Sequence, residues 1–199
     1  MPDDKRGREK QARNADRRQR ERAIATELDR MDDPEPPIDE TELAFFETAL
    51  EELNFPVTGN DVVSEMGHRE IEGTEETFSV AELIPATEAE FFEDPEAVRQ
   101  QIQRPTVAKA MKRILEETGS RQGVSLKGSR RDGYKKTFEE LEAIDPIDED
   151  EGIQAITDWI IEELRESGKL PGSRAVRRQA AKYCRSVGYK VQNDEWLGV

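Results

Sequence analysis

Residues 152–168 read GIQAITDWIIEELRESG, and this stretch decides the fold class of the C-terminal half of the chain. Its apolar residues recur three or four positions apart, which places them on one face of an α-helix. They are Ile153, Ile156, Trp159, Ile160 and Leu164. The pattern predicts an amphipathic helix whose apolar face packs against neighbouring helices.

Helical patterns of the same kind lie on both sides of this stretch. Residues 105–119, PTVAKAMKRILEETG, begin with a proline and end with a glycine, as helices often do. Residues 173–188, SRAVRRQAAKYCRSVG, predict a last helix that Ser173 caps and Gly188 ends. Between them a further helix carries Tyr134, Phe138 and Leu141. We therefore predict a helical module over residues 105–199.

Residues 41–104 predict a smaller module that is mainly helical and contains short strands. TELAFFETALEELN, residues 41–54, has leucine and phenylalanine at helical spacing, and HREIEGTEETF favours a hairpin that turns at Gly73. Three helix starts are indicated by the pairs Thr58 with Asp61, Ser79 with Glu82, and Asp94 with Pro95. The predicted fold class is mainly α with minor β.

Two stretches of this smaller module resemble a known family. They are LNFPVTGNDVVSEMG, residues 53–67, and FSVAELIPATEAEFFEDPEAVRQQI, residues 78–102. Over residues 50–104 the chain resembles a small haloarchaeal domain of unknown function, with a Phe-Pro-Val turn, a short acidic helix and a D-x-P-x-x-V helix. The matching residues are Pro56, Val57, Val62, Val63, Pro95 and Val98. The resemblance implies a halophilic source and a small, mainly helical domain, and it implies no catalytic residue.

The composition is typical of a protein that stays hydrated in concentrated salt. Charged residues make up 38% of the chain and apolar residues 34%, and the formal net charge is −15. Such a composition also fits disorder, but periodic apolar patterns cover most of the chain after residue 40. We predict a halophilic protein with a charged leader, residues 1–40, that is disordered or helical.

The leader itself divides by charge. Residues 5–22 are rich in arginine, whereas the charged residues of 27–42 are almost all acidic. If the first part is helical, one face carries Arg6, Lys10, Arg13, Arg17 and Arg20. This stripe either lies along a phosphate backbone or belongs to a solvated tail, and the second interpretation is favoured because charged termini usually bury nothing.

The chain shows no signal for export or membrane insertion. Its N-terminal residues lack the apolar stretch of a signal peptide, and no segment approaches the roughly 20 apolar residues of a membrane span. Cys184 is the only cysteine, so no disulfide forms within the chain. We expect a cytoplasmic protein.

Basic residues gather in two places within this acidic chain. Residues 123–136, GVSLKGSRRDGYKK, are rich in glycine and positive charge, but Lys127 precedes Gly128, the wrong order for a P-loop. We predict a flexible basic loop here, and a basic side on the last helix. The candidate nucleic-acid-binding residues are Arg121, Lys127, Arg130, Arg131, Lys135, Lys136, Arg174, Arg177, Arg178, Lys182 and Arg185.

Two interpretations of the basic last helix stay open. With the helix before it, it loosely resembles a helix-turn-helix, although the turn at residues 168–172 is long for that motif. Alternatively, its arginines pair with acids of the preceding helix and of the DEDEG run before that helix.

Concentrated salt weakens any binding that depends on charge alone. For roughly six phosphate contacts, raising the salt from about 0.15 to about 2 M costs on the order of 10⁶ in affinity. Shape or stacking must then contribute, and Tyr134, Tyr183 and Tyr189 lie among the basic residues.

Other kinds of site lack the residues they need. His68 is the only histidine and Cys184 the only cysteine, which excludes the common zinc sites. With Gly152 at the sixth position of an EF-hand loop, Ile147 stands where aspartate is required. Cys184 falls on an apolar helix face, which favours a buried thiol over a nucleophile. We predict no catalytic residue, no cofactor, no metal and no enzyme.

Two functions remain, and neither involves a membrane. The favoured one is a non-enzymatic accessory or regulatory protein that binds RNA, the ribosome or DNA, because separate basic stretches persist in an acidic chain. It predicts that the basic residues of 121–136 and 174–185 converge on one exposed face. The other is an adaptor for a protein partner, which predicts an exposed apolar patch, with Trp196 and Leu197 as candidates.

Overall fold

The computed structural model describes most of the chain after residue 35, and these residues are mainly α-helical with two small sheets. The described residues are 36–38, 43–72, 77–88, 90–119, 121, 123–144 and 151–188. All of them belong to one compact unit, Pro36–Val199. The predicted fold class is confirmed. The predicted leader, apart from residues 36–38, the acidic run 145–150 and the tail 189–199 lie outside the described residues.

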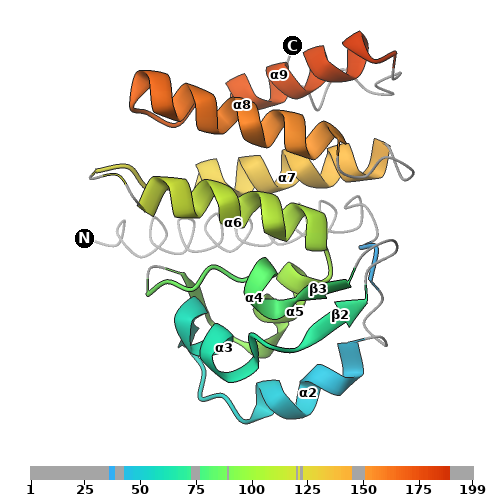
Figure 1. Ribbon diagram of the computed structural model, residues 1–199, viewed down its shortest axis with the longest axis vertical. Helices are drawn as coiled ribbons and strands as arrows, with labels where there is room; N and C mark the ends of the chain where they lie inside the picture. The colour runs from blue at the N-terminus through green and yellow to red at the C-terminus, as the bar shows by residue number, and fades with distance from the viewer. Residues whose placement is uncertain are drawn as a thin grey trace, which may run out of the picture. The chain divides into compact units, whose positions relative to one another are not determined.

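The smaller module contains short helices and two antiparallel pairs of strands (Figure 1). Its elements are α2 (Ala44–Glu51), β1 (Val57–Thr58), α3 (Gly59–Met66), β2 (Glu70–Glu72), β3 (Thr77–Ser79), α4 (Val80–Leu83), β4 (Phe91–Phe92) and α5 (Pro95–Ile102). Strand β2 pairs with β3 in the predicted hairpin, whose turn at Gly73 lies outside the described residues. Strand β1 pairs with β4, a long-range contact that the sequence does not predict.

The predicted helix starts of this module are confirmed in atomic detail. The Thr58 hydroxyl accepts a hydrogen bond from the Asp61 amide at 3.1 Å, and the Asp61 carboxylate accepts one from the Thr58 amide at 2.8 Å. The Glu82 carboxylate accepts from the Ser79 amide at 2.7 Å in the same manner. Asp94 accepts from the Ala97 amide at 2.9 Å, with proline at the first helical position. These caps satisfy amide groups that have no partner inside their helices.

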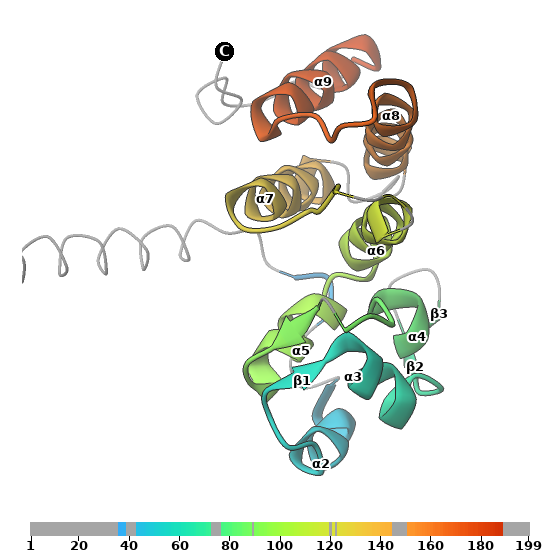
Figure 2. The same cartoon turned by 90° about the vertical axis from the view of Figure 1, so that its left-hand side faces the viewer.

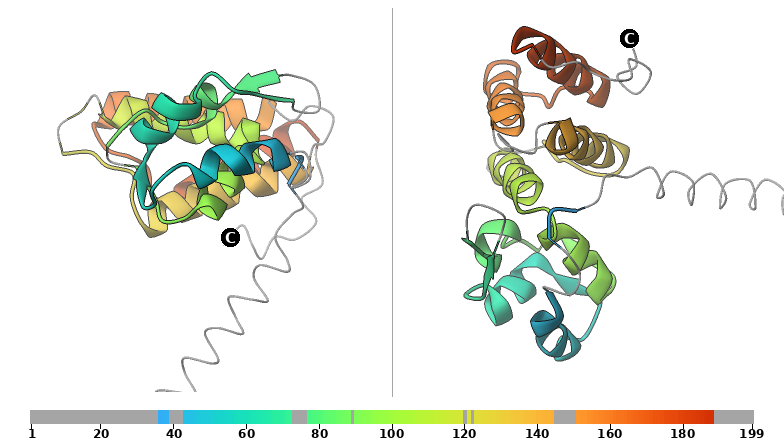
Figure 3. Two further views of the ribbon diagram at one scale, coloured as in Figure 1. Left: turned by 90° about the horizontal axis from the view of Figure 1, so that it is seen from below. Right: turned by 90° about the vertical axis from the view of Figure 1, so that its right-hand side faces the viewer.

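The helical module consists of four helices of 14 to 17 residues. They are α6 (Pro105–Gly119), α7 (Ser129–Ile144), α8 (Glu151–Ser167) and α9 (Ser173–Ser186). Helix α6 lies beside α8, α7 lies beside α9, and α8 also packs on α9 (Figures 2 and 3). The apolar faces that the sequence predicts turn inward, and Ile153, Ile156, Ile160 and Leu164 of α8 are all buried.

Two local predictions for this module are wrong. Residues 129–136, expected in a flexible loop, form the first two turns of α7, because Tyr134 and Phe138 anchor that helix in the core. Of the stretch 123–136, residues 123–128 precede the helix. Gly172, and not Ser173, is the N-cap of α9. The first prediction failed because tertiary packing continues α7 through Gly133.

Two apolar clusters meet near the start of α6. The first extends from Ile38 to Ala108, and the second from Val107 to Cys184. Ile38, which the sequence places in the leader, is 1% exposed, and its amide donates to the Gln103 carbonyl oxygen at 3.3 Å. The thiol of Cys184 is buried, as predicted. The division into modules at residue 104 stays a prediction.

Polar contacts join the smaller module to the helices. Arg104 is 7% exposed and forms an ion pair with the equally buried Glu142 of α7; its Nε lies 3.7 Å from Glu139. Arg131 of α7 pairs with Glu90, which is 3% exposed. Because buried charges are costly unless they are paired, these contacts require that the two clusters stay together.

We predict that Arg104→Met lowers the free energy of unfolding by about 3–5 kcal/mol, since it leaves the Glu142 carboxylate buried without its partner. The double variant Arg104→Met/Glu142→Leu should recover most of the loss, because it removes both charges. Urea denaturation at constant salt measures both.

The exposed pair Arg113–Asp158, with side chains 51% and 64% exposed, provides the control. Arg113→Gln should cost no more than about 1 kcal/mol. Equal losses in the free energy of unfolding for Arg104→Met and Arg113→Gln would show that the buried Arg104 pair contributes no more to stability than the exposed pair.

Candidate nucleic-acid interface

Helix α9 presents a basic surface. It carries five basic residues and no acidic residue over Ser173–Ser186. Val176, Ala180, Ala181 and Cys184 turn inward and are buried. Opposite them, at intervals of four, four and three positions, lie the exposed side chains of Arg174, Arg178, Lys182 and Arg185. One face of α9 therefore packs on α7 and α8, and the other offers positive charge to the solvent.

Three basic residues of α9 are not neutralised by the helix beside it. Among the residues that the structure describes, no carboxylate pairs with Arg174, Arg178 or Lys182. The acid Asp158 of α8 pairs instead with Arg113 of α6, at 2.7 Å. For Arg174, Arg178 and Lys182, pairing with the acids of α8, one of the two interpretations of this helix, is therefore not found among the described residues. That interpretation also invoked the DEDEG run, residues 148–152, of which residues 148–150 lie outside the described residues.

The N-terminal ends of α7 and α9 meet. A Cβ atom built on Gly133 would stand 2.6 Å from the Ser173 Cβ, so glycine permits a close approach of the two helices. The Tyr134 hydroxyl donates to the Pro171 carbonyl oxygen at 2.7 Å, just before α9 begins. Burial raises the pKa of Tyr134, an effect that the charge of Arg130 partly offsets.

This contact brings one predicted basic residue of α7 to α9. Arg130 lies one helical turn before Gly133 and therefore on the same face, which is the face that meets Ser173. Arg130 is exposed and has no carboxylate partner among the described residues. With Arg174 and Arg178 it extends the basic surface across two helices. We call Arg130, Arg174, Arg178 and Lys182 the α9 surface.

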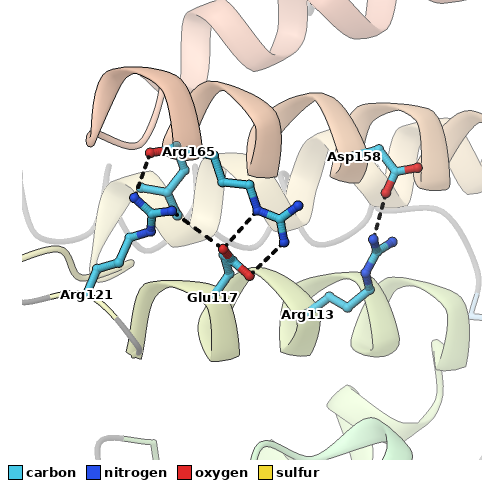
Figure 4. A network of polar contacts seen from close by, with 6 residues as sticks. Arg113, Glu117, Arg121, Asp158 and Arg165 are labelled. Carbon is cyan, nitrogen blue, oxygen red and sulfur yellow. Dashed lines mark hydrogen bonds and ion pairs between the residues drawn. The ribbon is translucent and has the colours of Figure 1, made fainter.

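Among the other predicted basic residues, some have acidic or other polar partners, and others lie away from the α9 surface. Arg121 donates to the Leu164 carbonyl oxygen at 3.3 Å and lies 3.7 Å from Glu117 (Figure 4). Lys135 lies 3.6 Å from Glu139, and Lys136 and Arg185 also have polar or electrostatic partners. Arg177 is half-buried on α9 without an ion pair among the described residues. Convergence of the basic residues on one exposed face stays a prediction.

Figure 4 shows how basic residues elsewhere are neutralised. Arg165 of α8 donates to both carboxylate oxygens of Glu117, at 3.1 and 3.2 Å, and Arg113 donates to Asp158. The hydrogen bond from Arg165 holds the pKa of Glu117 below its usual range. The α6–α8 side therefore consists of paired charges, in contrast to the α9 surface.

Sequence reasoning missed a groove on the other side of the α7 N-terminus. It has a volume of about 740 Å³ and lies between residues 85–91, the end of α6 and the loop 124–128. Phe91, which is 61% exposed, and Lys127 line it. A Phe-Phe pair gives no signal in the sequence about which ring faces outward; only the pairing of β4 with β1 decides this.

Other kinds of site find no support in the described part of the chain. No group of three histidine, cysteine, aspartate or glutamate side chains there is placed to hold a metal ion. None of the described helices is long and apolar enough to cross a membrane.

Comparisons with protein families agree with the predicted resemblance. Residues 40–114 match a family of unknown function, DUF5789. Residues 1–52 match a family described as Halobacterial acidic protein. The predicted similarity to a haloarchaeal domain of unknown function is confirmed, and the match extends past both ends of residues 50–104. The leader, which that resemblance did not include, has a family match of its own. No curated protein and no solved structure shows significant similarity to the chain.

We predict that Gly133→Ala destabilises the protein by about 1–2 kcal/mol, because the new methyl group meets the Ser173 Cβ. In the Ser173→Gly background the same change should be neutral or stabilising, since alanine favours a helix over glycine by about 1 kcal/mol. Urea denaturation of the four proteins measures the coupling. Stabilisation by Gly133→Ala in the wild-type background would show that α7 and α9 do not approach here.

Proposed function

We propose that this halophilic protein binds nucleic acid through the α9 surface and acts as a non-enzymatic accessory protein in the cytoplasm. One observation carries the proposal. Helix α9 has five basic and no acidic residues, and Arg174, Arg178 and Lys182 have no carboxylate partner among the described residues, in a chain of net charge −15. Unpaired positive charge along an exposed helix is what phosphate contacts require.

Solubility does not account for this surface. Acidic side chains hydrate the rest of the protein, and on the α6–α8 side arginines are paired with acids. The charged residues of α9 are all basic, and they reduce the net negative charge of the protein. Binding to an anionic polymer accounts for a helix of this charge. Arginine suits this role, because its planar guanidinium forms two parallel hydrogen bonds to a phosphate.

An adaptor for a protein partner is the second candidate, and the exposed ring of Phe91 favours it. Its other candidates, Trp196 and Leu197, lie outside the described residues. Phe91 and Val187 are the large apolar side chains that the described part of the chain exposes. They lie on different elements, so they do not provide the contiguous apolar patch of a typical protein interface.

We predict that Arg174→Gln/Arg178→Gln weakens binding to a labelled oligonucleotide and makes it less sensitive to salt. Each lost phosphate contact reduces the slope of log K against log salt by about 0.7–0.9, so two should reduce it by about 1.4–1.8. Fluorescence anisotropy from about 0.2 to about 2 M KCl measures the slope.

The matched control is Arg113→Gln/Arg165→Gln, which removes the same charge from the paired α6–α8 side. It should leave the slope unchanged. An equal loss of affinity in both double variants would assign the effect to net charge and contradict a defined interface. Absence of binding by the wild-type protein at every salt concentration would exclude this function.

A further inference from the structure

The groove beside α7 contains an aromatic ring that is held in place and exposed. Strand β4 pairs with β1, with Phe91 opposite Thr58 and Phe92 opposite Val57. Phe92 is 3% exposed and anchors the strand in the core, which turns Phe91 outward. Side chains on a strand alternate in this way. The other apolar walls of the groove come from Pro85, Leu115, Val124 and Leu126.

One charged side chain of the groove has no partner. Glu90 pairs with Arg131, Glu116 lies 3.6 Å from Lys112, and Glu88 accepts a hydrogen bond from Asn60 at 3.3 Å. Lys127 is exposed and forms no ion pair with the described residues. Glu88 is exposed and accepts only from a neutral amide, so the groove presents an aromatic ring, the positive charge of Lys127 and the negative charge of Glu88.

The groove and the α9 surface lie on two sides of the same helical turn. Arg131 and Gly128 face the groove, whereas Arg130 lies on the face of α7 that meets Ser173 of α9. Arg130 and Arg131 are adjacent in the chain, so the first turn of α7 lies between the two surfaces. A flexible polymer bound along α9 can therefore reach the groove by crossing the first turn of α7.

Binding in concentrated salt needs a contact that salt does not weaken. A surface with about four phosphate contacts loses on the order of 10³–10⁴ in affinity between about 0.15 and about 2 M salt. Stacking of a base on an aromatic ring adds about 1–3 kcal/mol per base, and every base offers a face for it. Phe91 is the exposed aromatic ring among the large apolar side chains of the described residues.

We propose that the groove binds one unpaired base of a single-stranded nucleic acid, with the base stacked on Phe91 and the adjoining phosphate at Lys127. The inference depends on the proposed function, because the α9 surface supplies the remaining phosphate contacts. It adds the kind of nucleic acid that is bound. A duplex keeps its bases stacked inside and cannot place one on Phe91, whereas a single strand or a loop can.

The experiment compares three variants in their binding to a labelled single-stranded oligonucleotide and to a duplex of the same sequence. Phe91→Leu keeps an apolar side chain but removes the ring, and should weaken single-strand binding by about tenfold. Phe91→Trp should retain binding, since tryptophan also stacks. Lys127→Gln should weaken binding at low salt and have little effect at about 2 M salt, because its contribution is electrostatic.

The salt dependence separates stacking from charge. The ratio of wild-type to Phe91→Leu affinity should stay constant from low to high salt, whereas the ratio for Lys127→Gln should fall. Urea denaturation of Phe91→Leu checks that the exposed substitution leaves the fold intact.

The two proposals fail in different ways. If the wild-type protein binds neither oligonucleotide, the proposed function itself is wrong. If it binds, but Phe91→Leu binds equally well or the duplex binds as tightly as the single strand, only this inference is overturned. The groove would then be assigned to the second candidate function, binding of a protein partner.

Discussion

The buried ion pair between Arg104 and Glu142 is the constraint on which the arrangement of the described residues depends. Arg104 stands between α5 and α6, where the two apolar clusters meet, and Glu142 belongs to α7. Arg104 and Glu142 are each 7% exposed, so each charge depends on its partner. The pair fixes α7 against the smaller module. Helix α9 packs on α7, and its position therefore follows from the same constraint.

Arginines on the α6–α8 side of the helical module are paired with acids, whereas Arg174 and Arg178 of α9 are not. On the α6–α8 side, exposed arginines face glutamate and aspartate, and each such pair contributes little to stability. On α9 all the charged residues are basic. An acidic protein can tolerate this arrangement because its many carboxylates keep it soluble. The contrast, more than the number of basic residues, distinguishes α9 from the rest of the protein.

Prediction from sequence succeeded where the relevant interactions lie within a few residues. The caps at Thr58, Ser79 and Asp94 join groups three positions apart, and the apolar stripe of α8 repeats within one helix. It failed at Gly133, which the sequence suggests is a loop residue. There the close contact with Ser173 makes glycine useful inside a helix. The site was predicted in part, since a list of basic residues does not reveal which of them have acidic partners.

The sequence by itself determined the fold class, the helix starts, the acidic character and the basic residues of α9, because composition, periodicity and caps are local properties. Only the tertiary structure decided which charges are paired, that Arg130 lies beside α9, and that Phe91 faces a groove while Phe92 is buried. Outside single helices, these features join residues that are 33 to 48 positions apart in the chain, from Thr58 with Phe91 to Glu117 with Arg165. Such contacts form only when distant segments pack together, and no local pattern encodes them.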